Sequence, residues 1–144
     1  LITDAPKHEN WEKIHIESAR YVIYCRCDHP FAKRTKISLS ELEQETVILP
    51  EKGSLTRHLL DQACDRYAIS LARTATMTTF PLMCEAVLQG IGVALFLQNS
   101  SLIKDQLCEI SIKEMPEVRN TSLIATKDRA RLKLVLQFIN AAIE

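Results

Sequence analysis

Three segments of the chain carry apolar residues at the spacing of an amphipathic helix. Residues 54–67 and 79–89 have apolar side chains at intervals of three and four, which predicts a helix in each segment. Ser54 is a favourable N-cap for the first helix, and Pro81 suits the first turn of the second. The third helix lies near the end of the chain and has the clearest pattern, with apolar positions at Leu132, Val135, Leu136, Ile139 and Ile143.

Shorter apolar segments between these helices predict strands. Residues 14–27 predict one long strand or two joined strands in which alternate positions from Tyr21 to Cys27 share one face. Further strands are predicted at 46–49, 69–76, 93–97, 108–112 and 121–126, and a short helix at 39–44. Strands that alternate with helices and have apolar interiors predict an α/β fold with a largely parallel or mixed sheet.

The charge balance excludes some classes of partner for this segment. The chain has 18 Lys and Arg residues, 18 Asp and Glu residues and no net charge. Nucleic-acid binding normally needs a basic surface, and the one short basic cluster, Lys33, Arg34 and Lys36, is more typical of a solvated loop. No stretch approaches the roughly 18 apolar residues that span a membrane. We therefore expect that these residues contact neither DNA nor a membrane.

The sequence offers little for catalysis or metal binding. It lacks a glycine-rich phosphate loop, a Gly-x-Ser-x-Gly elbow and a His-Glu-x-x-His motif, and its four histidines have no evident partners. Five cysteines, mostly within apolar segments, predict reduced and buried thiols. Cys25, Cys27 and His29 would share one side of a strand, but zinc needs four ligands and no second pair is nearby. We predict no enzyme activity, no metal and no cofactor.

Two turns have the chemistry of a ligand site. The segment from Pro50 to Arg57 is a strand end, a glycine turn and a helix start whose first turn has hydroxyl and cationic groups but no acid. Such a start favours a carboxylate or another anion, because the N-terminal N–H groups and the helix dipole attract negative charge. Thr78, Thr79 and Phe80 form a second helix start of this kind. The alternative is two ordinary capped turns, and the sequence alone does not separate the two.

Several short motifs then occur in the order of a known family. They are Asp28–Ala32, Ile37–Leu42, Val47–Pro50, Gly53–Ser54 with Arg57, and Glu85–Leu95 with its valine, glycine and small residues. Together they resemble the effector-binding domain of LysR-type transcriptional regulators over nearly the whole chain.

The resemblance implies a periplasmic-binding-protein-like (type II) fold with two α/β lobes around an effector cleft. Residues 1–22 and 104–144 would form part of the first lobe, which would be incomplete, and residues 23–103 the second. The DNA-binding helix-turn-helix domain would lie outside this chain. Peroxide-sensing members carry a reactive cysteine in the turn that reads Gly53-Ser54-Leu55 here, and its absence argues against thiol sensing. By turn chemistry and by position in the family, the candidate ligand-binding residues are Thr3, Asp4, Pro50, Ser54, Arg57, Thr78, Thr79 and Phe80.

These expectations favour the interpretation that the chain is the effector-binding and oligomerisation domain of a cytoplasmic LysR-type regulator. A small, anionic metabolite would bind in the cleft between the lobes, and a homodimer or homotetramer would transmit the signal to DNA through the helix-turn-helix domain. The alternative is a solute-binding protein of a transport system with the same fold. That alternative would need an export signal and an oxidising compartment, in which free cysteines are uncommon.

Overall fold

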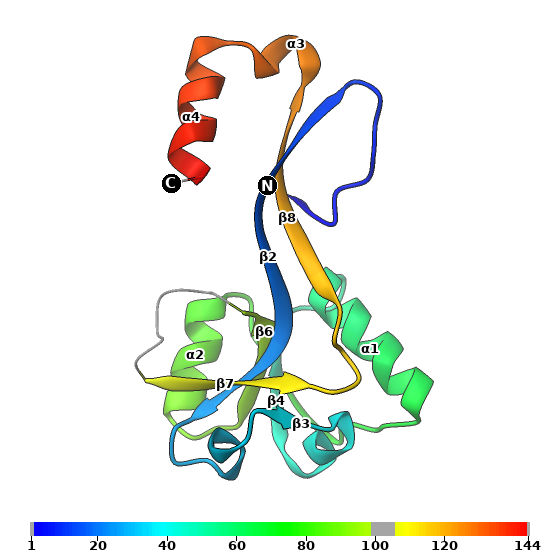
Figure 1. The fold of residues 1–144 in the computed structure, drawn as a ribbon. Helices are drawn as coiled ribbons and strands as arrows, with labels where there is room; N and C mark the ends of the chain where they lie inside the picture. The colour runs from blue at the N-terminus through cyan, green and yellow to red at the C-terminus, as the bar shows by residue number, and fades with distance from the viewer. Residues whose placement is uncertain (1, 99–105, 144) are drawn as a thin grey trace. The chain divides into compact units, whose positions relative to one another are not determined.

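The computed structural model describes the backbone of residues 2–98 and 106–143, which form two compact units. The terminal unit contains residues 1–19 and 118–144, and the central unit contains residues 20–117 (Figure 1). This division differs from the lobe boundaries expected from the sequence at residues 20–22 and 104–117, and the assignment of lobes stays a prediction. Among the described residues, no helix combines the length and the apolar character needed to cross a membrane.

The central unit is built on a mixed sheet. Its strands are the second part of β2 (Trp11–Arg26), β3 (Lys36–Ile37), β4 (Thr46–Leu49), β5 (Arg73–Thr76), β6 (Val93–Leu97) and β7 (Leu107–Ile112). β4 lies between β5 and β6 and runs parallel to both, whereas β2 pairs antiparallel with β6 and β7. β3 pairs parallel with β7. The predicted α/β fold with a mixed sheet is thus confirmed.

Helices cover both faces of this sheet. They are α1 (Leu55–Tyr67) and α2 (Phe80–Leu88), and two short 3-10 helices, η1 (Pro30–Lys33) and η2 (Leu39–Gln44), complete the unit. Alternate residues of β2 point to opposite cores: Ile23 belongs to the cluster that α1 covers, and Tyr24 to the cluster that α2 covers. α1 and α2 therefore lie on opposite faces (Figure 1). Both helices begin within one residue of the positions predicted from the sequence.

The terminal unit has fewer elements. They are β1 (Ile2–Thr3), the first part of β2, β8 (Val118–Thr126), α3 (Lys127–Ala130) and α4 (Lys133–Ile143). β8 lies between β1 and β2 in the strand order and pairs antiparallel with β1. The predicted C-terminal helix is present as α4, but its apolar stripe is only partly buried: Ile139 is buried, whereas Leu132 and Leu136 are exposed.

Candidate functional site

The two predicted turns lie at the same edge of the central sheet. β4 and β5 are parallel neighbours in which Leu49 is opposite Thr76, so both strands end at the same level. Just beyond, the N–H of Met77 donates to the carbonyl oxygen of Leu49 at 2.9 Å. α1 then leaves β4 on one face and α2 leaves β5 on the other. In open α/β sheets, a place where successive helices change faces beyond the strand ends is where ligands gather.

Ser54 shapes the first of these turns. Its Oγ accepts a hydrogen bond from the N–H of Arg57 at 3.2 Å, so Ser54 is the N-cap of α1, as predicted. Gly53 precedes it with a φ of 95°, in the left-handed region that suits glycine. The cap uses the hydroxyl only as an acceptor, so its proton is free to be donated. Pro50 is buried beneath the turn, so it can shape a site but offers little surface to a ligand.

Arg57 points along α1 toward a neighbouring acid. Its Nε donates to the two carboxylate oxygens of Asp61 at 3.0 and 3.2 Å, an i,i+4 pair on the helix surface. With Leu49, Cys64 and Thr74, these residues line a shallow depression of about 260 Å³ on the flank of α1. The pairing with Asp61 makes Arg57 a weaker candidate for anion binding than the sequence suggested.

The second turn combines exposed hydroxyls with a packed aromatic ring. Thr78 and Thr79 are exposed, and the side chain of Thr79, although at the N-cap position of α2, makes no capping hydrogen bond. Phe80 instead packs against the ring of Phe96, with centroids 4.6 Å apart, and edge-on against Tyr24 at 5.2 Å. The hydroxyl of Thr79 is thus available for a ligand, whereas Phe80 holds the start of α2 against the sheet.

Thr3 and Asp4 belong to the terminal unit. Asp4 has a φ of 50°, and its carboxylate accepts hydrogen bonds from the N–H of Asn120 at 3.0 Å and from Arg119 at 3.1 Å. These contacts tie the end of β1 to β8, which indicates a structural role for Asp4. Thr3 lies in β1, and its side chain is outside the described part of the structure.

The sequence counted Thr56, the second residue of α1, among the hydroxyls available to an anion, but it did not show that this side chain points into the protein. It is buried, and its Oγ1 donates to the hydroxyl oxygen of Tyr21 at 3.4 Å, which links the first turn of α1 to β2. The signal was a threonine in a helix turn where a purely surface position would favour an acid.

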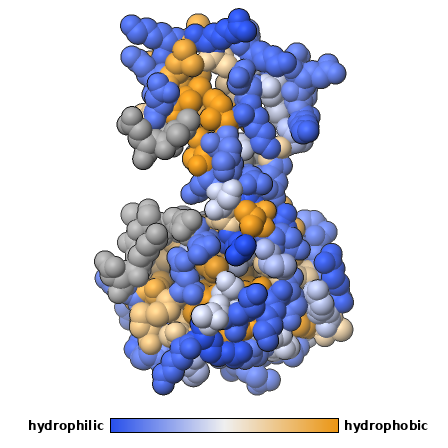
Figure 2. Space-filling view, viewed as in Figure 1, coloured by the Kyte–Doolittle hydropathy of each residue, from blue (hydrophilic) through white to orange (hydrophobic). Residues whose placement is uncertain are grey.

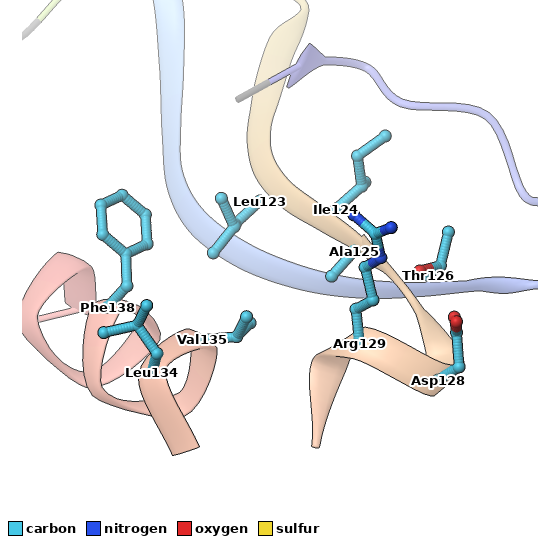
Figure 3. Close-up of a pocket in the computed structure, with 9 residues that line it drawn as sticks. All are labelled: Leu123, Ile124, Ala125, Thr126, Asp128, Arg129, Leu134, Val135 and Phe138. Carbon is cyan, nitrogen blue, oxygen red and sulfur yellow. The ribbon is translucent and has the colours of Figure 1, made fainter. Parts of the chain in front are cut away.

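The sequence did not predict the apolar groove of the terminal unit. It has a volume of about 730 Å³ and lies among β8, α3 and α4 (Figure 3). Leu123 of β8 lines it together with Leu134, Val135 and Phe138 of α4. Figure 2 shows hydrophobic residues gathered on the surface over α4 and β8. This lining suits apolar groups, and Thr126, Asp128 and Arg129 add polar groups to it.

The side chains of Cys25, Cys27 and His29 lie in different surroundings. Within residues 2–98 and 106–143, no group of three or more His, Cys, Asp and Glu side chains is placed to hold an ion. His29 Nδ1 accepts from the N–H of Phe31 at 3.2 Å, and Nε2 lies 3.5 Å from a carboxylate oxygen of Glu45. Cys25 is buried and Cys27 is exposed, so the three side chains have different surroundings.

Comparisons with known proteins connect this geometry to one family. Residues 1–144 match the family model described as the LysR substrate binding domain. Over 109 residues the chain is 34% identical to the HTH-type transcriptional regulator CysL of Bacillus subtilis (strain 168). This match covers 73% of this chain but only 36% of CysL. The chain thus spans about a third of that relative.

Solved structures share the fold at low sequence identity. The regulatory domain of Synechocystis PCC6803 CcmR in complex with 2-PG matches with a TM-score of 0.74 and 20% identity, over 99% of this chain and 70% of that chain. The effector-binding domain of QuiR in complex with shikimate matches with a TM-score of 0.71 and 20% identity, over 96% and 66% of the respective chains.

Proposed function

This chain belongs to the LysR substrate-binding domain family, the effector-binding part of LysR-type transcriptional regulators, and on this premise we propose that it binds a small carboxylate-bearing metabolite at the edge beyond β4 and β5. The family consists of regulators and not of enzymes. The observation that carries the proposal is the hydrogen bond between Met77 and Leu49, because it joins the ends of the two strands from which the chain leads into α1 and α2. That the site is shared with a second lobe stays a prediction of the resemblance.

The chemistry of the edge suits an anion. The first turns of α1 and α2 contain no acidic residue, and each presents N–H groups that have no partner within the helix. The hydroxyls of Ser54 and Thr79 can donate to a carboxylate oxygen, and hydrogen bonds to charged groups are worth roughly 1.5–3 kcal/mol. Among the structural relatives, QuiR is in complex with shikimate, a carboxylate. Arg57 would contribute only by leaving Asp61.

We further propose that DNA is contacted by a helix-turn-helix domain outside residues 1–144. Two observations support this: the relative CysL is an HTH-type regulator of which this chain matches 36%, and the chain itself has no net charge. Cytoplasmic location and a homodimeric or homotetrameric state are expected for such a regulator and belong to the same proposal.

Thr79→Ala is the sharpest test, because the threonine side chain makes no cap that its loss would break. We expect isothermal titration of the chain with a panel of small carboxylates, including shikimate, and with inorganic phosphate to detect at least one ligand. Thr79→Ala should weaken its binding by about tenfold, equivalent to about 1.4 kcal/mol. Thr35→Ala, at an exposed loop threonine of the same unit, is the control and should bind as the wild type does. Equal affinity of all three proteins would refute the placement of the site.

A further inference from the structure

Two of the five cysteines lie close enough to react with each other. The sulfur atoms of Cys27 and Cys108 are 3.0 Å apart, and both residues are present as free thiols. A disulfide bond is about 2.05 Å long, so the sulfurs need to approach by only about 1 Å. The two residues are 81 positions apart in the sequence, so the spacing of cysteines along the chain gave no sign of the pair.

The sheet holds the pair in register. β2 and β7 are antiparallel, and Cys25 is directly opposite Cys108 in their ladder. Cys27 follows two positions later, one residue beyond the end of β2, and therefore returns to the same side as Cys25, diagonal to Cys108. Its Sγ also lies 3.7 Å from the carbonyl oxygen of Gln106. The β2–β7 ladder fixes the backbone at Arg26 and Cys108, so the remaining approach of the sulfurs falls to the two side chains and to the turn that contains Cys27.

The other cysteines lack this combination of proximity and access. Cys27 is exposed and Cys108 half-buried, so a small oxidant reaches the pair from solvent. Burial raises the pKa of Cys25 to about 12 and that of Cys84 to about 11, and it also raises the pKa of Cys64, so all three remain thiols near neutral pH. The hydrogen bond with Cys27 is the main cause that raises the pKa of Cys108, and either sulfur can be the donor in that bond.

We propose that Cys27 and Cys108 form a reversible dithiol–disulfide pair whose oxidant is a low-molecular-weight disulfide. The Cys27 thiolate attacks one sulfur of the oxidant RSSR, which forms a mixed disulfide and releases RS⁻. The Cys108 thiolate then attacks the Cys27 sulfur, forms the Cys27–Cys108 bond and releases the second RS⁻. The protein thiols lose two electrons and two protons, and RSSR is reduced to two RSH. This pair is separate from the Gly53–Leu55 turn, where the family resemblance argued against thiol sensing, and from the effector edge.

A redox titration of the folded chain tests the proposal. The chain would be equilibrated without denaturant in mixtures of reduced and oxidised glutathione, alkylated, and analysed by peptide mass spectrometry. We expect the number of free thiols to fall from five to three, with the mass of two hydrogen atoms lost and a peptide link between Cys27 and Cys108. Adding excess reduced glutathione should restore all five.

Three variants make the result specific. Cys27→Ser and Cys108→Ser should each abolish the intramolecular disulfide, and Cys108→Ser should instead accumulate a mixed disulfide at Cys27. Cys64→Ser, at a half-buried thiol on α1, is the matched control and should leave the midpoint of oxidation unchanged. The proposal is overturned if Cys27 and Cys108 stay fully alkylatable at the most oxidising ratio, or if the linked peptides contain other cysteines.

Discussion

Helices α2 and α4 are both rich in apolar residues, but they are packed very differently. In the central unit, α2 buries Met83, Cys84, Ala86 and Val87, each at most 4% exposed. In the terminal unit, Leu134 of α4 is 78% exposed and Phe138 is 61% exposed. Of the α4 side chains that the structure describes, Ile139 alone is buried.

This difference shows where the stability of the chain comes from. The central unit closes a core on each face of its sheet, whereas the terminal unit leaves an apolar groove open beside β8. Each Å² of apolar surface removed from water contributes about 25 cal/mol, and the exposed part of α4 gains none of it. The chain matches 70% of the regulatory domain of CcmR, which is therefore longer than the part compared. We therefore expect the central unit to be the more stable of the two in this chain.

Truncation of core residues should give the largest contrast. Met83→Ala removes a side chain with no exposed surface and should lower the free energy of unfolding of the central unit by about 2–5 kcal/mol. Phe138→Ala, on α4, should change that of the terminal unit by no more than about 0.5 kcal/mol, because most of the side chain is already exposed to solvent. The chain offers separate probes for the two measurements in urea: its single tryptophan, Trp11, lies in the terminal unit, and all five cysteines lie in the central unit.

Cysteine labelling would follow the central unit, since buried Cys25 becomes reactive only when that unit opens. Leu82→Ala, at a half-exposed leucine of the same helix, is the matched control for Met83→Ala and should have little effect. If Phe138→Ala shifted the Trp11 transition as far as Met83→Ala shifts the labelling transition, the contrast between the units would be wrong.

The same contrast explains what the sequence could predict about the fold. α1 and α2 were predictable because cap residues, apolar spacing and breakers all agree locally. The helix at α4 was also predictable, but not which of its residues are buried. A helical stripe specifies a face, and whether that face is covered depends on partners that lie elsewhere in the polypeptide.

The candidate site also has features that the sequence could predict and features that it could not. The positions of both turns follow from strand and helix signals, and their meeting at one edge follows from the parallel pairing of β4 and β5. The direction in which each side chain points does not follow from these signals. Phe80 packs against Tyr24 and Phe96, which are distant in sequence, so no local pattern could show it. The Arg57–Asp61 pair was within reach of sequence reasoning, because the two residues are four apart on a helix.

An intermediate effect is expected from the helix caps of the central unit. Ser54→Ala removes the acceptor for the N–H of Arg57 and should lower the free energy of unfolding by about 1 kcal/mol. Thr79→Ala removes a side chain that makes no such bond, so its effect on stability should be smaller. Urea denaturation followed by cysteine labelling compares the two. A larger loss for Thr79→Ala would mean that the α2 start is stabilised by a contact other than a cap.

The smallest effect concerns a surface carboxylate of the central unit, Glu41. Its side chain accepts hydrogen bonds from the guanidinium of Arg34 and, at 2.7 Å, from the N–H of Ser38, and these lower its pKa. A carboxyl whose pKa is lower in the folded state stabilises the protein above its ordinary pKa of about 4.3, and this contribution disappears as the pH falls through the lowered value.

Glu41→Gln keeps an acceptor for Ser38 but removes the charge. It should therefore reduce stability slightly at pH 7 and make no difference at a pH below the lowered pKa. Circular dichroism of urea unfolding across this pH range measures the effect, with Glu51→Gln, at an exposed carboxylate of the same unit, as the control. A penalty that stays constant or grows toward acid pH would show that Glu41 acts through packing and not through its charge.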